Sequence, residues 1–164
     1  MHIVLIAPEI PGNTGNISRL CAATGIELDL VRPLGFSTDD KHLKRAGLDY
    51  WQFLSVHYHD DFSEVLERYR GHRFYYLSSK GPRAYSEISY TPEDILVFGC
   101  ESKGIPEDIL AAHWDECVRI PMIHEARSLN LSSSAAIVAY EALRQNGFPG
   151  LTGHGRGLHS SSPI

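Results

Sequence analysis

The sequence is poor in cysteine, in long apolar runs and in positive charge. Its 164 residues include three cysteines, Cys21, Cys100 and Cys117, which are odd in number and far apart. That usage fits a reducing cytoplasm and argues against a disulfide scaffold or a zinc site. No apolar run is long enough to span a bilayer, and no basic-then-apolar signal peptide opens the chain. The sequence therefore predicts a cytoplasmic protein without a membrane anchor.

Basic residues are fewer than acidic ones, 15 against 20, which gives a net charge of −5 with histidine neutral. Proteins that coat nucleic acid non-specifically depend on many phosphate contacts, so this class is disfavoured. A single basic patch is still compatible with the composition, because Lys41, Lys44 and Arg45 lie close together. These residues form either a solvated helix face or a phosphate-binding surface.

Several catalytic signatures are absent. There is no Gly-x-Ser-x-Gly elbow, which argues against a serine hydrolase. Gly12 to Gly15 and Gly99 to Gly104 match neither a dinucleotide fingerprint nor a P-loop, which argues against a nucleotide-binding oxidoreductase. The segment His57-Tyr58-His59-Asp60-Asp61 would place two histidines on one face of a strand. Because no further ligand stands at a known spacing, we interpret it as an exposed polar loop and predict no metal site.

Apolar residues occur in two alternating kinds of segment. Short apolar runs predict strands at His2 to Ala7, Glu27 to Val31, Arg73 to Leu77, Asp94 to Phe98 and Cys117 to Ile120. Helical spacing predicts helices through Ile17, Leu20, Cys21 and Thr24, capped by Gly25, through Phe62, Val65, Leu66 and Tyr69, and from Leu131 to Gly147. Asp39 to Ala46 predicts a further short helix. This order indicates an α/β domain with a mainly parallel sheet flanked by helices.

Three segments that follow predicted strands are rich in glycine, proline and polar residues. They are Asn13-Thr14-Gly15-Asn16-Ile17-Ser18-Arg19, then Phe98-Gly99-Cys100-Glu101-Ser102-Lys103-Gly104, and then Ile120-Pro121-Met122 with Ser128-Leu129-Asn130-Leu131-Ser132. In parallel sheets, ligands bind beyond the carboxyl ends of the strands. One site could therefore collect all three segments.

In this order and at this spacing, the three segments resemble the signature motifs of the SPOUT-class RNA 2′-O-methyltransferases. Within that class the chain is most similar to the tRNA (cytidine/uridine-2′-O-)-methyltransferases of the TrmL/YibK type, from Ile3 to about Gly150. The resemblance implies a SPOUT domain over residues 1–150 with a C-terminal trefoil knot, working as a homodimer. It also implies methyl transfer from S-adenosyl-L-methionine, leaving S-adenosyl-L-homocysteine, to the wobble cytidine or uridine of leucine tRNAs. Residues 151–164 have little apolar content, and we predict that they form a disordered tail.

The resemblance also assigns residues to the cofactor, to the reaction and to RNA. The positions that match the family's cofactor contacts are Leu77, Gly99, Glu101, Ile120, Met122, Ser128 and Leu129. The positions that match its catalytic residues are Asn13, Arg19, Glu101, Ser128 and Asn130. RNA contacts are expected from Arg19, Lys41, Lys44 and Arg45.

The residues themselves leave some of these roles open. On its predicted helix Arg19 points away from the apolar stripe, so it could reach RNA or a second subunit. Because arginine loses its proton reluctantly, we favour a charged Arg19 that binds a phosphate and stabilises the forming alkoxide over one that acts as a base. Glu101 could equally be a loop carboxylate or a cap for the turn from Ile105 to Leu110. Ser128 and Asn130 could both cap the last helix.

Two other functions remain compatible with the sequence. One is an rRNA 2′-O-methyltransferase of the same class, which differs only in its substrate. The other is a non-catalytic RNA-binding protein of SPOUT fold. The presence of Arg19, Glu101, Ser128 and Asn130 argues against this second alternative.

Overall fold

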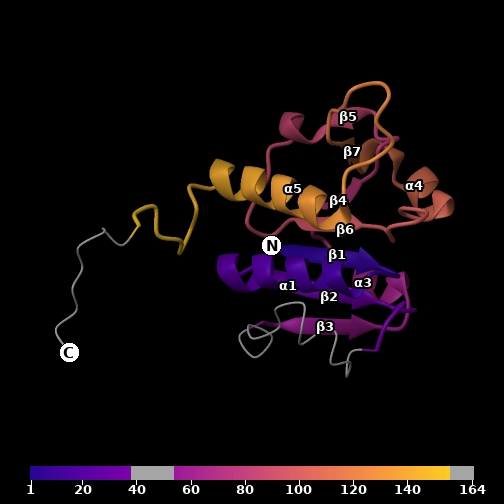
Figure 1. Ribbon diagram of the computed structural model, residues 1–164, viewed down its shortest axis with the longest axis horizontal. Helices are drawn as coiled ribbons and strands as arrows, with labels where there is room; N and C mark the ends of the chain where they lie inside the picture. The colour runs from indigo at the N-terminus through magenta and orange to yellow at the C-terminus, as the bar shows by residue number, and fades with distance from the viewer. Residues whose placement is uncertain (38–53, 156–164) are drawn as a thin grey trace.

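The computed structural model describes residues 1–37 and 54–155, which form a seven-stranded sheet between two layers of helices (Figure 1). The strands are β1 (His2–Ile6), β2 (Glu27–Val31), β3 (Val56–His59), β4 (Phe74–Leu77), β5 (Arg83–Ala84), β6 (Ile95–Phe98) and β7 (Cys117–Arg119). The α-helices are α1 (Pro11–Thr24), α3 (Phe62–Arg68), α4 (Glu107–Ala112) and α5 (Leu131–Gln145). Two short 3₁₀ helices, η2 (Tyr85–Glu87) and η3 (Trp114–Glu116), complete the described part.

The strands lie in the order β3-β2-β1-β6-β4-β7-β5, and every pair of neighbours is parallel. The central strands β1 and β6 pair in register from His2 opposite Ile95 to Leu5 opposite Phe98. Apart from His2 both strands are apolar, and helices cover both faces of the sheet, as parallel sheets require. The predicted α/β class with a mainly parallel sheet is confirmed.

Each face of the sheet has its own helical layer and apolar core. On one face Ile17 and Cys21 of α1 pack with Val138 and Ala142 of α5. On the other face Val65 of α3 and Leu110 of α4 belong to the second core. The helical spacing in the sequence therefore marks buried residues of α1, α3 and α5, whereas α4 lies where the sequence suggests only a turn from Ile105 to Leu110.

Helix α1 begins earlier than the sequence indicates. The proline and glycine residues before Ile17 predict a loop, whereas the helix starts at Pro11 and contains Asn13 to Asn16. Proline is well placed at the first helical position, because its φ is already helical and its missing N–H would have no partner there. The helix ends where predicted, with Gly25 in the left-handed conformation (φ 74°) and its N–H bonded to the Cys21 carbonyl at 2.8 Å.

The interpretation of His57 to Asp61 as an exposed polar loop is wrong for His57 to His59, but it is confirmed for Asp60 and Asp61, which are exposed in the bend after the strand. Residues Val56–His59 form strand β3, which pairs with β2, and His59 is buried. The sequence did not predict this strand because its histidines are polar, and their hydrogen-bond partners lie on strand β2, which is distant in the sequence. His57 Nε2 lies 2.7 Å from Glu27 Oε2, and His59 Nε2 lies 2.7 Å from Asp29 Oδ1.

Asp29 is the buried centre of a polar cluster beneath α3. Besides His59, its carboxylate contacts His2 Nδ1 at 3.1 Å and accepts hydrogen bonds from the Tyr69 hydroxyl at 2.9 and 3.1 Å. Burial acts to raise the pKa of Asp29, but the hydrogen bonds from His2, His59 and Tyr69 outweigh it, so the pKa lies below its usual value. The carboxylate is therefore held in its charged form and links β1, β2 and β3 to Tyr69, the residue that follows α3.

We expect Asp29→Asn to lower the free energy of unfolding by about 3 kcal/mol. The asparagine amide is uncharged, and its NH₂ group would face hydrogen-bond donors from among His2, His59 and Tyr69 in place of an acceptor oxygen. Urea unfolding at neutral pH measures this change. Asp60→Asn is the matched control, since Asp60 is exposed and its ion pair with Arg32 is at the surface; its effect should stay within about 0.5 kcal/mol. Equal effects of the two substitutions would contradict the role of Asp29.

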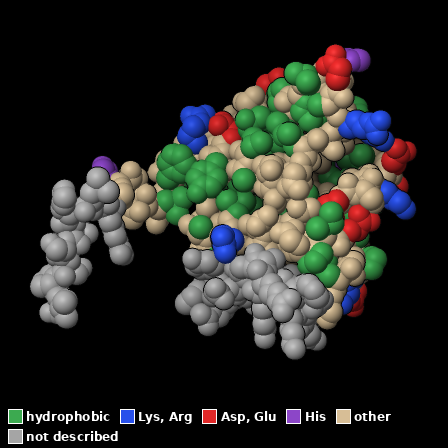
Figure 2. All heavy atoms as spheres, in the orientation of Figure 1, with side chains coloured by type: hydrophobic (Ala, Val, Ile, Leu, Met, Phe, Trp, Pro, Cys, Tyr) green, Lys and Arg blue, Asp and Glu red, His purple; other side chains and the backbone are tan. Residues whose placement is uncertain are grey.

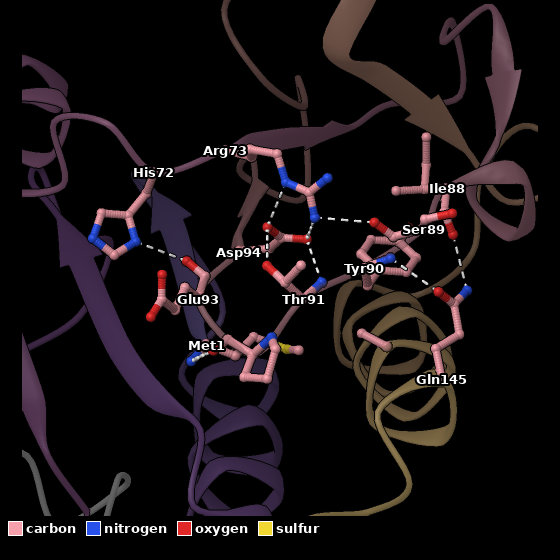
Figure 3. A network of polar contacts seen from close by, with 12 residues as sticks. Met1, His72, Arg73, Ile88, Ser89, Tyr90, Thr91, Glu93, Asp94 and Gln145 are labelled. Atoms are coloured by element: carbon pink, nitrogen blue, oxygen red, sulfur yellow. Dashed lines mark hydrogen bonds and ion pairs between the residues drawn. The ribbon is translucent and has the colours of Figure 1, made fainter.

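A second polar network fastens the amino ends of the central strands to the end of α5 (Figure 3). The buried Asp94 carboxylate accepts bonds from Arg73 at 3.0 and 2.9 Å and from Thr91 at 2.7 and 2.8 Å. Nearby, the Gln145 side chain accepts from Tyr90 N and donates to the Ile88 carbonyl, both at 2.9 Å. The polar side chains at this end of the sheet thus bond to one another and to the backbone. A ligand site is instead expected at the opposite end, where the strands have their carboxyl ends.

Some sequence predictions fall outside the described residues. These are the helix from Asp39 to Ala46 with Lys41, Lys44 and Arg45, and the part of the tail from residue 156 onward. Within residues 1–37 and 54–155, no helix combines the length and apolar character that crossing a bilayer requires.

Candidate active site

A cavity of about 450 Å³ opens at the carboxyl ends of β4, β6 and β7. Leu77, Phe98 and Ile120, each at or directly after the end of one of these strands, line it. Its other walls come from the start of α1, the loop after β6 and the segment before α5. All three signature segments therefore contribute to one cavity, as the strand-end argument predicts. Its volume falls in the range of small-molecule sites.

The residues predicted for the cofactor lie together around this cavity. The lining includes Leu77, Gly99, Glu101, Ile120, Met122, Ser128 and Leu129, together with Asn13 and Asn130. Arg19 is the exception. It is exposed on α1 six residues after Asn13, which is roughly 9 Å along the helix axis, and it is not among the lining residues.

The loop after β6 forms a wall of backbone atoms. A Cβ atom on Gly99 would lie 1.9 Å from the Gly104 carbonyl carbon and 2.0 Å from the Ile105 nitrogen. The loop closes through a bond from Gly104 N to the Cys100 carbonyl at 2.9 Å, with Gly104 at φ +73°. Only glycine permits this close approach at position 99 and this φ without strain at position 104. The wall can therefore present backbone groups to a ligand without obstruction by side chains.

Glu101 joins this loop to the start of α1. One carboxylate oxygen accepts from Glu9 N at 2.8 Å, and the other accepts from Ile10 N at 3.2 Å and from the Asn13 side chain at 2.9 Å. The alternative that Glu101 caps the turn from Ile105 to Leu110 is therefore wrong. The carboxylate instead satisfies N–H groups at the amino end of α1, where negative charge is favourable.

Asn13 and Asn130 continue this connection to the last helix. Asn130 donates its side-chain amide to Asn13 Oδ1 at 2.9 Å. Its own oxygen caps α5 by accepting from Ser132 N at 2.9 Å and Ser133 N at 3.2 Å. Asn130 is thus the cap that the sequence allows, whereas Ser128 is not. The three signature segments are therefore connected by two side-chain hydrogen bonds, from Asn13 to Glu101 and from Asn130 to Asn13.

We expect Glu101→Gln to lower the free energy of unfolding by roughly 1–3 kcal/mol, because three donors face these two oxygens and an amide retains only one acceptor. Urea unfolding measures the change. Glu67→Gln, at an exposed pair with Arg70 on α3, is the control and should have little effect. If both variants unfold at the same urea concentration as the unmodified chain, the hydrogen bonds to Glu101 do not stabilise the fold.

The charged side chains around the cavity are few. They are Lys80, Glu101 and Lys103. Lys80 pairs with Glu107 at 2.5 Å, and this hydrogen bond lowers the pKa of Glu107. In the part of the chain that the structure describes, no group of three or more histidine, cysteine or carboxylate side chains is arranged to hold a metal ion. Besides Lys80 and Lys103, the cavity offers a ligand backbone groups, hydroxyls and amides.

Several lining residues were not identified from the sequence. Ser78, Ser79 and Lys80 directly follow β4, and Ile10 lies exposed at the cavity before α1. The sequence did contain a signal for Ser78, Ser79 and Lys80, because this polar run directly follows the predicted apolar strand that ends at Leu77. Ile10 belongs to the segment Pro8-Glu9-Ile10-Pro11, which is part of the resemblance to the family, but the sequence did not assign it to the site.

Comparisons with known proteins agree with this geometry. Residues 1–140 match the description of the SpoU rRNA methylase family. A tRNA (cytidine(34)-2′-O)-methyltransferase of Escherichia coli (strain K12) is 49% identical over 151 residues, which is 92% of this chain and 96% of that protein. A solved structure described by "Structural insights into the 2-OH methylation of C/U34 on tRNA" is 45% identical with a TM-score of 0.85, covering 89% of this chain and 95% of that one. The SpoU methyltransferase AviRb from Streptomyces viridochromogenes, solved with the cofactor AdoMet, is 25% identical with a TM-score of 0.78, covering 89% of this chain and 57% of that one.

Proposed function

The chain belongs to the SpoU rRNA methylase family, and on that basis we propose that it is an S-adenosyl-L-methionine-dependent tRNA 2′-O-ribose methyltransferase. The proposed substrate is the wobble cytidine or uridine of leucine tRNAs. The observation that carries the proposal is the convergence of the three signature segments on one cavity, linked by Glu101, Asn13 and Asn130. The similarity to tRNA (cytidine(34)-2′-O)-methyltransferases over nearly their whole length supports the choice of substrate.

The cavity fits the cofactor in size and in chemistry. Its backbone wall at Gly99 admits a ligand closely, and Leu77, Ile120 and Leu129 offer apolar surface to an adenine ring. We assign cofactor binding to Leu77, Gly99, Ile120, Met122, Ser128 and Leu129. When bound, S-adenosyl-L-methionine supplies a methyl group on a positively charged sulfonium. Because both oxygens of Glu101 already accept bonds from protein groups, we assign this residue to shaping the site rather than to proton transfer.

Arg19 is proposed to act on the RNA rather than on the cofactor. Since guanidinium groups stay protonated, a charged Arg19 would bind the phosphate next to the reacting ribose and stabilise the alkoxide that forms at the 2′-oxygen. The proton of that hydroxyl would pass to an oxygen of the same phosphate. Its position on the outer side of α1, away from the cavity of its own chain, supports a site completed by a second subunit.

The outer face of α5 supports the homodimer in this proposal. Ile137 and Tyr140 are exposed on this helix at 36% and 47%, and Phe148 lies against Tyr140 with ring centroids 6.5 Å apart. Figure 2 shows hydrophobic side chains gathered over α5 on this side of the molecule. Helix α1, which packs against α5, carries the exposed Arg19 on this layer. Contiguous exposed apolar surface is typical of an interaction site, and a dimer over it would carry Arg19 toward the partner.

The remaining features of the proposal concern the chain as a whole. We propose a single SPOUT domain over residues 1–150 with a C-terminal trefoil knot, followed by a tail, in a cytoplasmic protein. Close contact between Gly81 and the backbone of Val118 on β7, where an added Cβ would lie 2.7 Å away, is compatible with tightly interleaved loops at this end. Lys41, Lys44 and Arg45 stay predicted phosphate contacts. Replacing Lys44 and Arg45 with alanine should weaken tRNA binding and reduce its salt dependence.

An rRNA substrate is the second candidate, because the family description names rRNA. The 25% identity to AviRb, of which the match covers 57%, gives it less support than the 49% identity to a tRNA enzyme of nearly equal length. We disfavour a non-catalytic role, because Asn13, Glu101 and Asn130 form an intact network at the cavity.

Two measurements test the proposed function. Titration calorimetry with a chelator present should show binding of S-adenosyl-L-homocysteine, and preference for a nicotinamide dinucleotide would refute the assignment. Ribose-methylation mapping of total RNA with and without the gene should show loss at position 34 of leucine tRNAs. Loss confined to rRNA would establish the second candidate instead.

A further inference from the structure

Glu9 lies between β1 and α1, in a segment whose backbone is tightly held. Ala7 adopts a left-handed conformation (φ 49°), and its N–H bonds to the Val31 carbonyl at 2.9 Å. On the other side, Gly35 N bonds to the Pro8 carbonyl at 2.9 Å, and a Cβ on Gly35 would lie 2.7 Å from Glu9 Cα. The position of Glu9 is therefore fixed by the sheet and the segment after β2.

The carboxylate of Glu9 accepts two hydrogen bonds from Ser102, the residue that follows Glu101. Glu9 accepts from Ser102 N at 3.0 Å and from the Ser102 hydroxyl at 2.7 Å, one bond on each oxygen. In return, Glu9 N donates to Glu101 at 2.8 Å. Two loops that lie 91 to 93 residues apart in the sequence are thus joined in both directions by charge-assisted bonds.

Glu9 does not line the cavity, but Ser102 does, within the loop Gly99 to Gly104 whose backbone makes its wall. We propose that Glu9 is a positioning residue: by holding Ser102, it fixes this loop in the shape that binds the cofactor. The inference rests on the proposed function, because it assumes that the cavity takes S-adenosyl-L-methionine. The three signature segments do not include Glu9, and its role depends entirely on the contact with Ser102.

The test compares Glu9→Ala, Glu9→Gln, Ser102→Ala and the double variant Glu9→Ala with Ser102→Ala. Glu9→Ala should raise the dissociation constant for S-adenosyl-L-homocysteine and the KM for S-adenosyl-L-methionine roughly ten-fold. The kcat should change less than about two-fold, since no reacting group is altered. Glu9→Gln should restore part of the affinity, because its carbonyl oxygen can still accept one of the two bonds. Glu87→Ala, on the exposed η2 turn, is the matched control and should leave both constants unchanged.

The double variant shows whether Glu9 acts through Ser102. If it does, the double variant binds the cofactor no more weakly than Glu9→Ala alone, since the Ser102 hydroxyl has then already lost its partner. Additive losses, an unchanged KM for the cofactor, or a defect confined to the KM for tRNA would overturn the inference. Amide hydrogen exchange separates this outcome from failure of the proposed function. Faster exchange of the Ser102 amide in Glu9→Ala would support the link even if the unmodified protein bound no cofactor, and unchanged exchange would refute it.

Discussion

Arg19→Ala should lose on the order of 100- to 1,000-fold in methyl transfer while binding S-adenosyl-L-homocysteine normally. The reason is that Arg19 is exposed on α1 and lies outside the cavity that we assign to the cofactor. Calorimetry and single-turnover methylation of tRNA measure the two properties separately. Arg19→Lys is the informative companion, because it keeps the charge but not the planar fork that grips a phosphate. A loss of cofactor binding in Arg19→Ala would contradict this division of roles.

Mixed dimers show whether Arg19 acts across the subunit interface. If it does, subunits with Arg19→Ala and subunits with a damaged cofactor cavity should regain activity together, because one of the two sites would have all its parts. Mass spectrometry must establish that the mixed dimers have formed. Confirmed mixed dimers without activity would place the action of Arg19 within its own chain.

Gly99→Ala should weaken binding of S-adenosyl-L-homocysteine on the order of 100-fold and reduce methyl transfer with it. The added Cβ would lie 1.9 to 2.2 Å from backbone atoms of Gly104 and Ile105, and no flexible side chain is available to yield. The loop itself must therefore move, and the wall of the cavity moves with it. Calorimetry on the purified variant measures the effect.

Gly12→Ala is the control for this substitution. Gly12 is also close to the site in sequence, at the start of α1, but nothing lies within 4 Å of an added Cβ. The change should leave cofactor binding intact and stabilise the helix by up to about 1 kcal/mol. If Gly99→Ala behaves like Gly12→Ala, the close approach at Gly99 does not govern the cavity.

The sequence by itself determined the fold class and the place of the site. Apolar runs such as Glu27 to Val31 became strands with the predicted bounds, and Gly25 ended α1 in the predicted conformation. These features depend on residues within one turn or one strand of each other, so local periodicity is sufficient to reveal them. The gathering of the three segments also followed from the sequence, because the carboxyl ends of parallel strands share one edge.

Only the tertiary structure decided which polar side chains meet at that edge. Glu101 and Asn13 are 88 residues apart, and Asn130 and Asn13 are 117 apart, so neither hydrogen bond leaves a mark in the local pattern. The start of α1 at Pro11 depends in part on the distant Glu101 carboxylate that accepts from the adjacent N–H groups. Strand β3 likewise became recognisable only once Asp29 and Glu27 supplied partners for its histidines. A polar side chain next to a strand can cap a helix, bond to another side chain or stay in solvent. Which of these occurs depends on the strand order, because placing β1 beside β6 brings the segments that follow these two strands together.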